Sequence, residues 1–228
     1  MELLDKIKSG KLRKRDLKGR DLFWKDIDGF TLLHFSAWFG HLDVAKLLVA
    51  TKNEKTNTGN TALHLAASNG RLAICKLLLD TKNILNNFGA TALHCAAGNG
   101  HLEIVKLLAD LSPIQDNDGF TALHMAVNHP TVCNLLKETR RLQSKSGSTA
   151  LHLAVVAKCV PTVELLLDTQ TIQDENGNTP LHYAAIIGTP ILCGLLISTK
   201  DIKNKRNETP LDISIKLNKE MAIQVLFQ

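Results

Sequence analysis

The chain has 228 residues and a formal net charge of +5, and 44% of its residues are hydrophobic. Its five cysteines lack paired spacing, which argues against a disulfide framework and favours reduced thiols in the cytoplasm, and also in the nucleus. The sequence has neither an eighteen-residue apolar run nor a secretory signal, so we expect no transmembrane segment.

The basic charge is concentrated at the N-terminus, where residues 1–27 are predicted to form a cap. Residues 1–25 hold nine of the 27 Lys and Arg residues and four of the 22 Asp and Glu residues, so the remainder has no net charge. Leu3 and Ile7 predict a short helix, and Leu12 with Leu17 indicates a second one. The basic cluster is either the solvated face of a terminal cap or a docking patch. It comprises Lys11, Arg13, Lys14, Arg15, Lys18 and Arg20.

A repeated unit occupies the rest of the chain. Each copy opens with a threonine, and the steps between these threonines are 30, 30, 30, 28, 30 and 30 residues. A fixed period of this kind is typical of a solenoid. The threonines are Thr31, Thr61, Thr91, Thr121, Thr149, Thr179 and Thr209.

Each copy is predicted to contain two short helices. A glycine turn, such as Asp28-Gly29 or Asn176-Gly177, precedes the threonine in all copies but the last. The threonine can cap the first helix, and Pro180 and Pro210 suit the first helical position. In the third copy the helices are expected over residues 91–99 and 101–108, separated by Gly100. The fourth copy lacks two residues near His129, where Pro130 is expected to start the second helix.

The element TLLH, TALH or TPLH, followed by an Ala pair and a GHL-type turn, resembles the ankyrin repeat over residues 26–228. The resemblance implies an all-α solenoid of stacked helix-turn-helix units with short β-turn or hairpin loops. It also implies one domain over 1–228, with a basic cap at 1–27 and a C-terminal cap repeat at 206–228. The repeats between them are expected at 28–57, 58–87, 88–117, 118–145, 146–175 and 176–205. The period is shorter than the usual 33, and Asp212 replaces the motif histidine in the last copy.

The recurring histidines are interpreted as structural. They are His34, His64, His94, His124, His152 and His182. One imidazole per repeat cannot share a metal ion, because stacked helices lie about 8–10 Å apart whereas zinc ligands lie within about 2.1 Å of the ion. We expect each imidazole to tie its own turn to the next one. The sequence shows no catalytic constellation, no metal site and no cofactor motif, so an enzyme is not expected.

The ankyrin resemblance implies a partner-facing side built from loop tips and the exposed ends of the first helices. These columns hold the residue before each repeat threonine and the two residues that end each first helix. Five of the chain's ten aromatic residues fall in them or at a loop tip, and aromatic anchors are typical of binding hot spots. The predicted partner-binding residues are Phe30, Trp38, Phe39, Asn69, Phe88, Asn99, Phe120, His129, Ile186 and Ile187.

Three hypotheses for the function follow from these patterns. The first is a monomeric, non-enzymatic adaptor, scaffold or inhibitor that binds a protein partner on its concave face and takes no small-molecule substrate. A narrower alternative is a role like that of gankyrin-like chaperones of proteasome assembly, or of ankyrin inhibitors of a kinase or transcription factor. The third is electrostatic docking of the basic N-terminal segment to nucleic acid, an import receptor or an acidic membrane. Because no basic stripe follows the repeats, nucleic acid is disfavoured as a partner.

Overall fold

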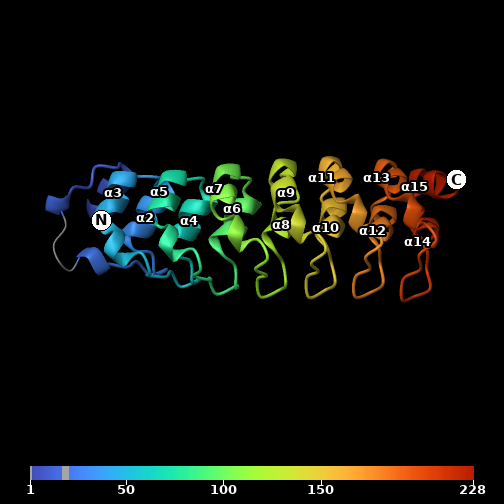
Figure 1. Cartoon of the computed structure of the whole chain (residues 1–228), viewed down its shortest axis with the longest axis horizontal. Helices are drawn as coiled ribbons and strands as arrows, with labels where there is room; N and C mark the ends of the chain where they lie inside the picture. Colours follow the sequence, from blue (N-terminus) through green and yellow to red (C-terminus); the bar gives the residue numbers. More distant parts are fainter. Residues whose placement is uncertain (1, 17–20) are drawn as a thin grey trace. The chain divides into compact units, whose positions relative to one another are not determined.

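The computed structural model describes residues 2–16 and 21–228, and the chain divides into two compact units, 1–117 and 118–228. Within each unit the helices form two layers, and loops project from one side (Figure 1). The described residues contain helices and turns, with one isolated bridge between Lys25 and Thr31 in place of a sheet. The expected all-α fold of stacked helix-turn-helix units is therefore confirmed.

In the first unit three helix pairs follow the N-terminal segment. That segment contains α1 (Glu2–Lys8), η1 (Lys14–Asp16) and η2 (Asp21–Phe23). The first helices of the pairs are α2 (Leu32–Phe39), α4 (Ala62–Ser68) and α6 (Ala92–Gly98). The second helices are α3 (Leu42–Leu48), α5 (Leu72–Leu77) and α7 (Leu102–Leu107), each followed by a 3-10 turn. These turns are η3 (Val49–Thr51), η4 (Leu79–Thr81) and η5 (Ala109–Leu111).

The second unit repeats this plan four times. Its first helices are α8 (Ala122–Met125), α10 (Ala150–Val156), α12 (Pro180–Ile187) and α14 (Pro210–Lys216). Its second helices are α9 (Pro130–Leu136), α11 (Val160–Leu165), α13 (Pro190–Leu195) and α15 (Glu220–Leu226). The 3-10 turns are η6 (Lys137–Thr139), η7 (Leu167–Thr169) and η8 (Ile197–Thr199). As expected, Pro130 starts the second helix of the shortened copy, and Pro180 and Pro210 occupy first helical positions.

Each first helix from α2 to α12 begins with a threonine–histidine capping box. In α4 the imidazole Nδ1 of His64 lies 3.2 Å from the backbone nitrogen of Thr61 and 2.8 Å from its hydroxyl oxygen. Because a backbone N–H can only donate, Nδ1 accepts and the proton of the neutral ring is on Nε2. This Nε2 donates to the carbonyl oxygen of Ala90 in the next repeat, at 3.1 Å. The proposed structural role of the histidines is thus confirmed for this copy.

The same bond from one repeat to the next recurs in both units, and we call the set the histidine ladder. In the first unit His34 Nε2 also donates, to the carbonyl of Asn60. In the second unit His124, His152 and His182 donate to Ser148, Asn178 and Glu208. In the last repeat the carboxylate of Asp212 replaces the ring and accepts from the backbone nitrogen of Thr209 at 2.8 Å. A carboxylate has no proton for a further repeat, so the ladder ends there.

The core lies between the helix layers of each unit. Alanines such as Ala66, Ala67, Ala96 and Ala97 are fully buried, which allows neighbouring first helices to approach closely. Leu63 and Leu93 beside them are also buried, and burying a leucine side chain contributes about 1.5–3 kcal/mol.

The segment after each second helix from α3 to α13 begins with a 3-10 turn. The hydroxyl of Thr81 donates to the carbonyl of Leu78 at 2.8 Å, and Thr51, Thr139, Thr169 and Thr199 do the same in their own copies. These bonds satisfy carbonyls that the helix end leaves open.

The N-terminal segment packs on the first repeat. Ile7 and Leu12 are buried, and the Lys8 carbonyl accepts from His41 Nε2 at 3.0 Å. The expected first helix is present as α1, whereas the second is reduced to the single turn η1. Leu17 lies outside the described residues.

Candidate functional site

An aromatic pocket of about 320 Å³ lies in the first unit. It brings together three predicted residues, Phe30, Trp38 and Phe39, and adds Phe35, Asp26 and Asp28. Phe30 precedes the threonine of the first repeat, while Trp38 and Phe39 end α2, so residues eight positions apart meet at one place. We call this site the aromatic pocket.

The walls of the aromatic pocket are fixed by the turn below them. The Asp26 carboxylate accepts from the backbone nitrogens of Asp28 at 3.0 Å and Phe30 at 2.7 Å. The ring of Phe30 then lies 5.4 Å from that of Phe35 and 6.1 Å from that of Trp38, centre to centre. Such tilted ring pairs contribute about 0.5–1.5 kcal/mol beyond their buried area. The pocket is therefore preformed.

Trp38 is the most accessible ring of the aromatic pocket, with 43% of its surface exposed. Its backbone carbonyl accepts from the guanidinium Nε of Arg71 at 3.2 Å, which anchors the end of α2 to the next repeat. The rim is acidic, because Asp28 is exposed and Asp26 is half-buried. An apolar side chain of a partner could pack on the exposed ring of Trp38 and exclude water from it. Polar groups around that side chain would then contact the carboxylates of Asp26 and Asp28.

The remaining predicted residues of the first unit lie apart from this pocket. The side-chain amides of Asn69 and Asn99 donate to the carbonyls of Leu65 and Cys95 in their own helices. Phe88 is 62% exposed at a loop tip. Its backbone carbonyl accepts from the backbone nitrogen of Asn117 at 2.8 Å, and its backbone nitrogen donates to the side-chain oxygen of Asn86 at 3.0 Å.

The predicted residues of the second unit are also dispersed. Phe120 is half-buried and meets His124 edge-on, 5.5 Å between ring centres. His129 is the half-buried residue before α9, and Ile187 is half-buried at the end of α12. Ile186 is 39% exposed and lines a second pocket.

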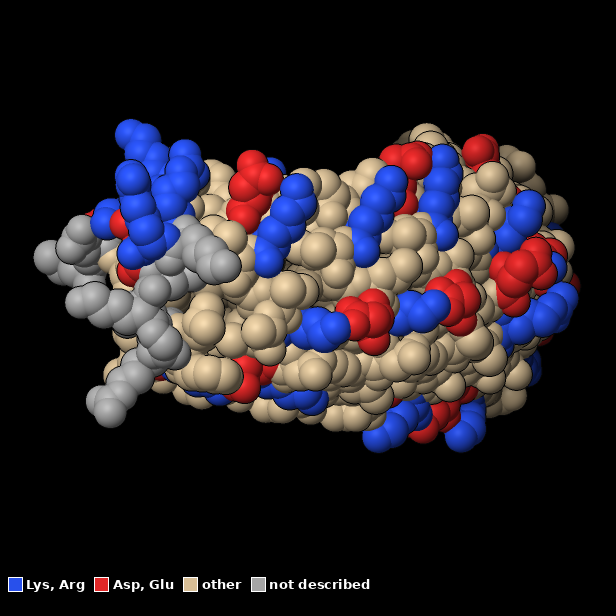
Figure 2. Space-filling view, turned by 60° about the vertical axis from the view of Figure 1, so that its left-hand side comes forward, with Lys and Arg blue, Asp and Glu red and all other residues tan. Residues whose placement is uncertain are grey.

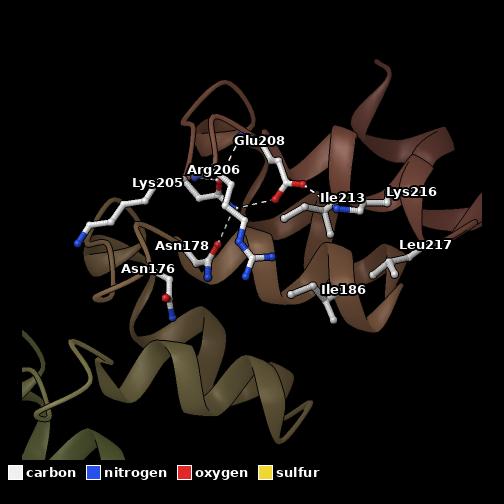
Figure 3. Close-up of a pocket in the computed structure, with 10 residues that line it drawn as sticks. Asn176, Asn178, Ile186, Lys205, Arg206, Glu208, Ile213, Lys216 and Leu217 are labelled. Atoms are coloured by element: carbon white, nitrogen blue, oxygen red, sulfur yellow. Dashed lines mark hydrogen bonds and ion pairs between the residues drawn. The ribbon is translucent and has the colours of Figure 1, made fainter.

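This second pocket has a volume of about 460 Å³ and differs from the first in its charge. Figure 3 shows its side chains, with Arg206 reaching from a loop towards Asn178 and Ile186. We call it the Arg206 pocket. Its lining residues are Asn176, Asn178, Ile186, Asn204, Lys205, Arg206, Glu208, Ile213, Lys216 and Leu217. Sequence reasoning selected only Ile186 from this set, although Asn178, Glu208, Lys216 and Leu217 fall in the same repeat columns.

The basic N-terminal segment forms a charged surface. Figure 2 shows Lys and Arg side chains gathered at the N-terminal end, whereas basic and acidic residues alternate over the rest of the visible face. Lys11, Arg13 and Arg15 are exposed there, and Lys6 pairs with Asp16 at 3.0 Å. The backbone of Lys14 lies in η1. The predicted Lys18 and Arg20 lie outside the described residues.

The titratable core groups favour their neutral forms. Burial lowers the pKa of His34 and His64 to about 4 and raises the pKa of Cys75 to about 12. It also raises the pKa of Cys95, Cys133 and Cys193 to about 11. Over residues 2–16 and 21–228 no group of three His, Cys, Asp or Glu side chains could hold a metal ion. In the same residues no helix is long and apolar enough to span a bilayer.

Comparison with known proteins identifies the repeats. A family model described as ankyrin repeats (3 copies) matches residues 8–86, 80–141, 115–176 and 129–206. No curated protein matches the chain. Among solved structures, the ankyrin repeat domain of Bcl-3, described as a unique member of the IkappaB protein family, is similar with a TM-score of 0.73 and 27% identity. That match covers 88% of this chain and 100% of the Bcl-3 domain.

Proposed function

Because this chain belongs to the ankyrin-repeat family, we propose that it is a protein–protein interaction module that binds its partner through loop tips and first-helix ends. The ankyrin fold and the likeness to the Bcl-3 domain support the general role in protein binding. The finer role, as an adaptor, scaffold or inhibitor acting on its concave face as a monomer without catalysis, is part of the proposal. Five free cysteines are consistent with the proposed cytoplasmic and nuclear location.

The observation that carries the proposal is the aromatic pocket. Trp38 remains 43% exposed although Phe30 and Phe35 support the wall beside it. An exposed tryptophan on a rigid helix end loses little conformational entropy on binding, and tryptophan is enriched among residues that dominate binding energy. The acidic rim made by Asp26 and Asp28 favours a partner surface that is apolar in the centre and basic around it.

The test is binding of a purified partner, first isolated by affinity capture, to the wild type and to Trp38→Ala. We expect the mutation to weaken binding by at least tenfold and to leave the melting temperature within a few degrees, since Trp38 is largely outside the core. The double variant Trp38→Ala with Phe120→Ala should abolish capture. A matched control is Leu47→Ala, which removes a partly exposed apolar side chain from α3 in the same repeat. Unchanged affinity in both tryptophan variants would contradict the proposed site.

A second candidate function is electrostatic docking through the basic N-terminal segment. It is favoured by the exposed Lys11, Arg13 and Arg15 and by the gathering of basic side chains in Figure 2. Binding of an acidic surface through this segment should weaken steeply with salt. An assembly-chaperone role at the proteasome, or inhibition of a kinase or transcription factor, would be distinguished by the identity of the captured partner.

A further inference from the structure

We infer that the Arg206 pocket binds an acidic, aliphatic segment of a partner protein, in which a carboxylate pairs with Arg206 while a neighbouring apolar side chain packs on the isoleucines below. This inference rests on the proposed protein-binding role but concerns a separate pocket in the second unit. It assigns the chemistry of the ligand, which the aromatic pocket does not determine.

The loop that carries Arg206 is held in place by its neighbours. The side-chain oxygen of Asn204 accepts from the backbone nitrogens of Arg206 at 2.9 Å and Glu208 at 3.1 Å. The Asn204 amide donates to the side-chain oxygen of Asn178 at 3.0 Å. The backbone nitrogen of Lys205 donates to the Asn176 carbonyl at 2.9 Å, so the loop is tied to the preceding one. The guanidinium is thus presented from an ordered turn.

The charges of the pocket favour an anionic ligand. Lys205, Arg206 and Lys216 contribute three positive charges, and Glu208 contributes one negative charge. Glu208 is already engaged, because it accepts from Lys216 at 3.1 Å and from Asn204 at 3.4 Å. The hydrogen bond from Lys216 lowers the pKa of Glu208 the most, and the bond from Asn204 lowers it further, so Glu208 stays ionised.

Arg206 itself is available to a ligand. Within the described part of the chain its guanidinium makes no hydrogen bond or ion pair, and the residue is exposed. The guanidinium has five N–H donors in a planar fork that matches a carboxylate in a bidentate pair. The side-chain amides of Asn176 and Asn178 lie near it and offer further hydrogen bonds (Figure 3).

The apolar floor selects the kind of anion. Ile213 is nearly buried, whereas Ile186 and Leu217 are 39% and 45% exposed and would lose water under an aliphatic side chain. The lining contains no aromatic ring on which a nucleic-acid base could stack. A volume of about 460 Å³ is in the range of ligand pockets and suits one or two side chains of a peptide. Together these features favour an acidic peptide over a phosphate backbone.

The experiment titrates the full chain with fluorescent eight-residue peptides and follows their anisotropy. The probes alternate leucine with glutamate, with glutamine or with lysine. We expect saturable binding of the glutamate peptide and at least tenfold weaker binding of the other two. Arg206→Glu should abolish binding of the glutamate peptide, Arg206→Ala should weaken it at least tenfold, and Arg206→Lys should restore part of it.

Lys145→Ala is the matched control, since Lys145 is an exposed loop lysine at the position in its own repeat that Lys205 occupies. It should bind the glutamate peptide like the wild type. Equal binding by wild type and Arg206→Glu, equal binding of the glutamine peptide, or no saturable binding would each overturn the inference. None of these results depends on Trp38, so loss of partner binding in Trp38→Ala would still support the proposed function.

Discussion

The Nε2 atom of His64 lies 3.1 Å from the carbonyl oxygen of Ala90, the residue before the threonine of the next repeat. The same ring accepts at Nδ1 from the backbone nitrogen of Thr61. Both ring nitrogens are therefore used, in opposite roles, inside the protein. Protonation of Nδ1 would place a second proton against the N–H of Thr61, so the neutral ring is the form that fits.

Stability should fall when the pH falls below about 6.5. Burial lowers the pKa of His34 and His64 to about 4, and it also lowers the pKa of His152 and His182. The unfolded chain then binds more protons than the folded chain, so the stabilising contribution is complete above pH 6.5 and is lost progressively towards pH 4. The loss should be roughly 1–3 kcal/mol for each of His34 and His64.

Urea unfolding between pH 7 and pH 4.5 measures this loss. The pKa values of Asp16, Glu208 and Asp212 are lowered from their ordinary values, so the stability that these carboxylates contribute is lost mainly below about pH 4, the range of an unfolded carboxyl group. A free energy of unfolding that stays constant from pH 7 to pH 4.5 would contradict the assignment of neutral, buried rings.

His64→Ala should destabilise the chain more than Asp212→Ala. The first change leaves the Thr61 N–H and the Ala90 carbonyl without their partner in the core, at a cost of about 2–4 kcal/mol. The second change removes an exposed N-cap interaction, because among the residues described the carboxylate of Asp212 accepts only from its own repeat. Its loss should lower the free energy of unfolding by about 1 kcal/mol. Urea midpoints compare the two, and equal losses would argue against the bond between repeats.

Two glycine-to-alanine changes should have opposite signs. At Gly70 the backbone has φ of +72°, and a Cβ would lie 2.8 Å from the ring of His101, so Gly70→Ala should lower stability by about 1 kcal/mol or more. At Gly194, within α13, a Cβ meets only Val225 at 4.0 Å. Gly194→Ala should raise stability by about 0.5–1 kcal/mol. Thermal unfolding distinguishes the two variants. A shift of the melting temperature in the same direction for both would contradict the backbone geometry described for Gly70 and Gly194.

Neutralising the basic segment should change salt dependence without affecting the fold. The variant Lys11→Gln, Arg13→Gln, Arg15→Gln removes three exposed charges that lie outside the repeat core. If the segment binds an acidic surface such as a vesicle with anionic lipid, the affinity of the wild type should fall steeply with salt, and the variant should show a smaller slope. Identical slopes for wild type and variant would exclude these side chains from the contact, provided the melting temperatures agree.

The regular parts of the molecule could be predicted from the sequence because one residue recurs at each position. The threonine caps and the bonds of His64 to its own and the next repeat follow from periodicity, hydrogen-bonding capacity and helix spacing. The comparison of copies did not predict which long side chains reach back to the backbone of the preceding repeat. The side chains of Arg71 and His101, at the turns between two helices, donate to the carbonyls of Trp38 and Ser68 one repeat earlier.

The candidate sites were predictable only in part. Phe30 and Trp38 both stand in the partner-facing columns of the repeat, whereas Phe35 stands outside these columns, at the position that Leu65, Cys95 and Met125 hold in other copies. The Arg206 pocket was missed because aromatic residues guided the choice. The hydrogen bonds between neighbouring loops also differ between copies. In the first unit the side-chain amide of Asn87 donates to the backbone carbonyl of Asn57, and in the second unit that of Gln173 donates to the backbone carbonyl of Lys203. Such bonds depend on loop geometry, which spacing alone does not determine.

The histidine ladder has a consequence for how the protein is made. Each imidazole is completed by a carbonyl that lies later in the chain, 26 residues on for His64. During synthesis, a repeat that has just left the ribosome therefore holds a ring whose proton has no protein acceptor until the next repeat emerges. Structure should then be consolidated one repeat behind translation, and a chain stopped in the middle of a repeat should end in a loose unit. The repeat that contains Asp212 does not depend on a later carbonyl, because its carboxylate is an acceptor and needs no acceptor from a later residue.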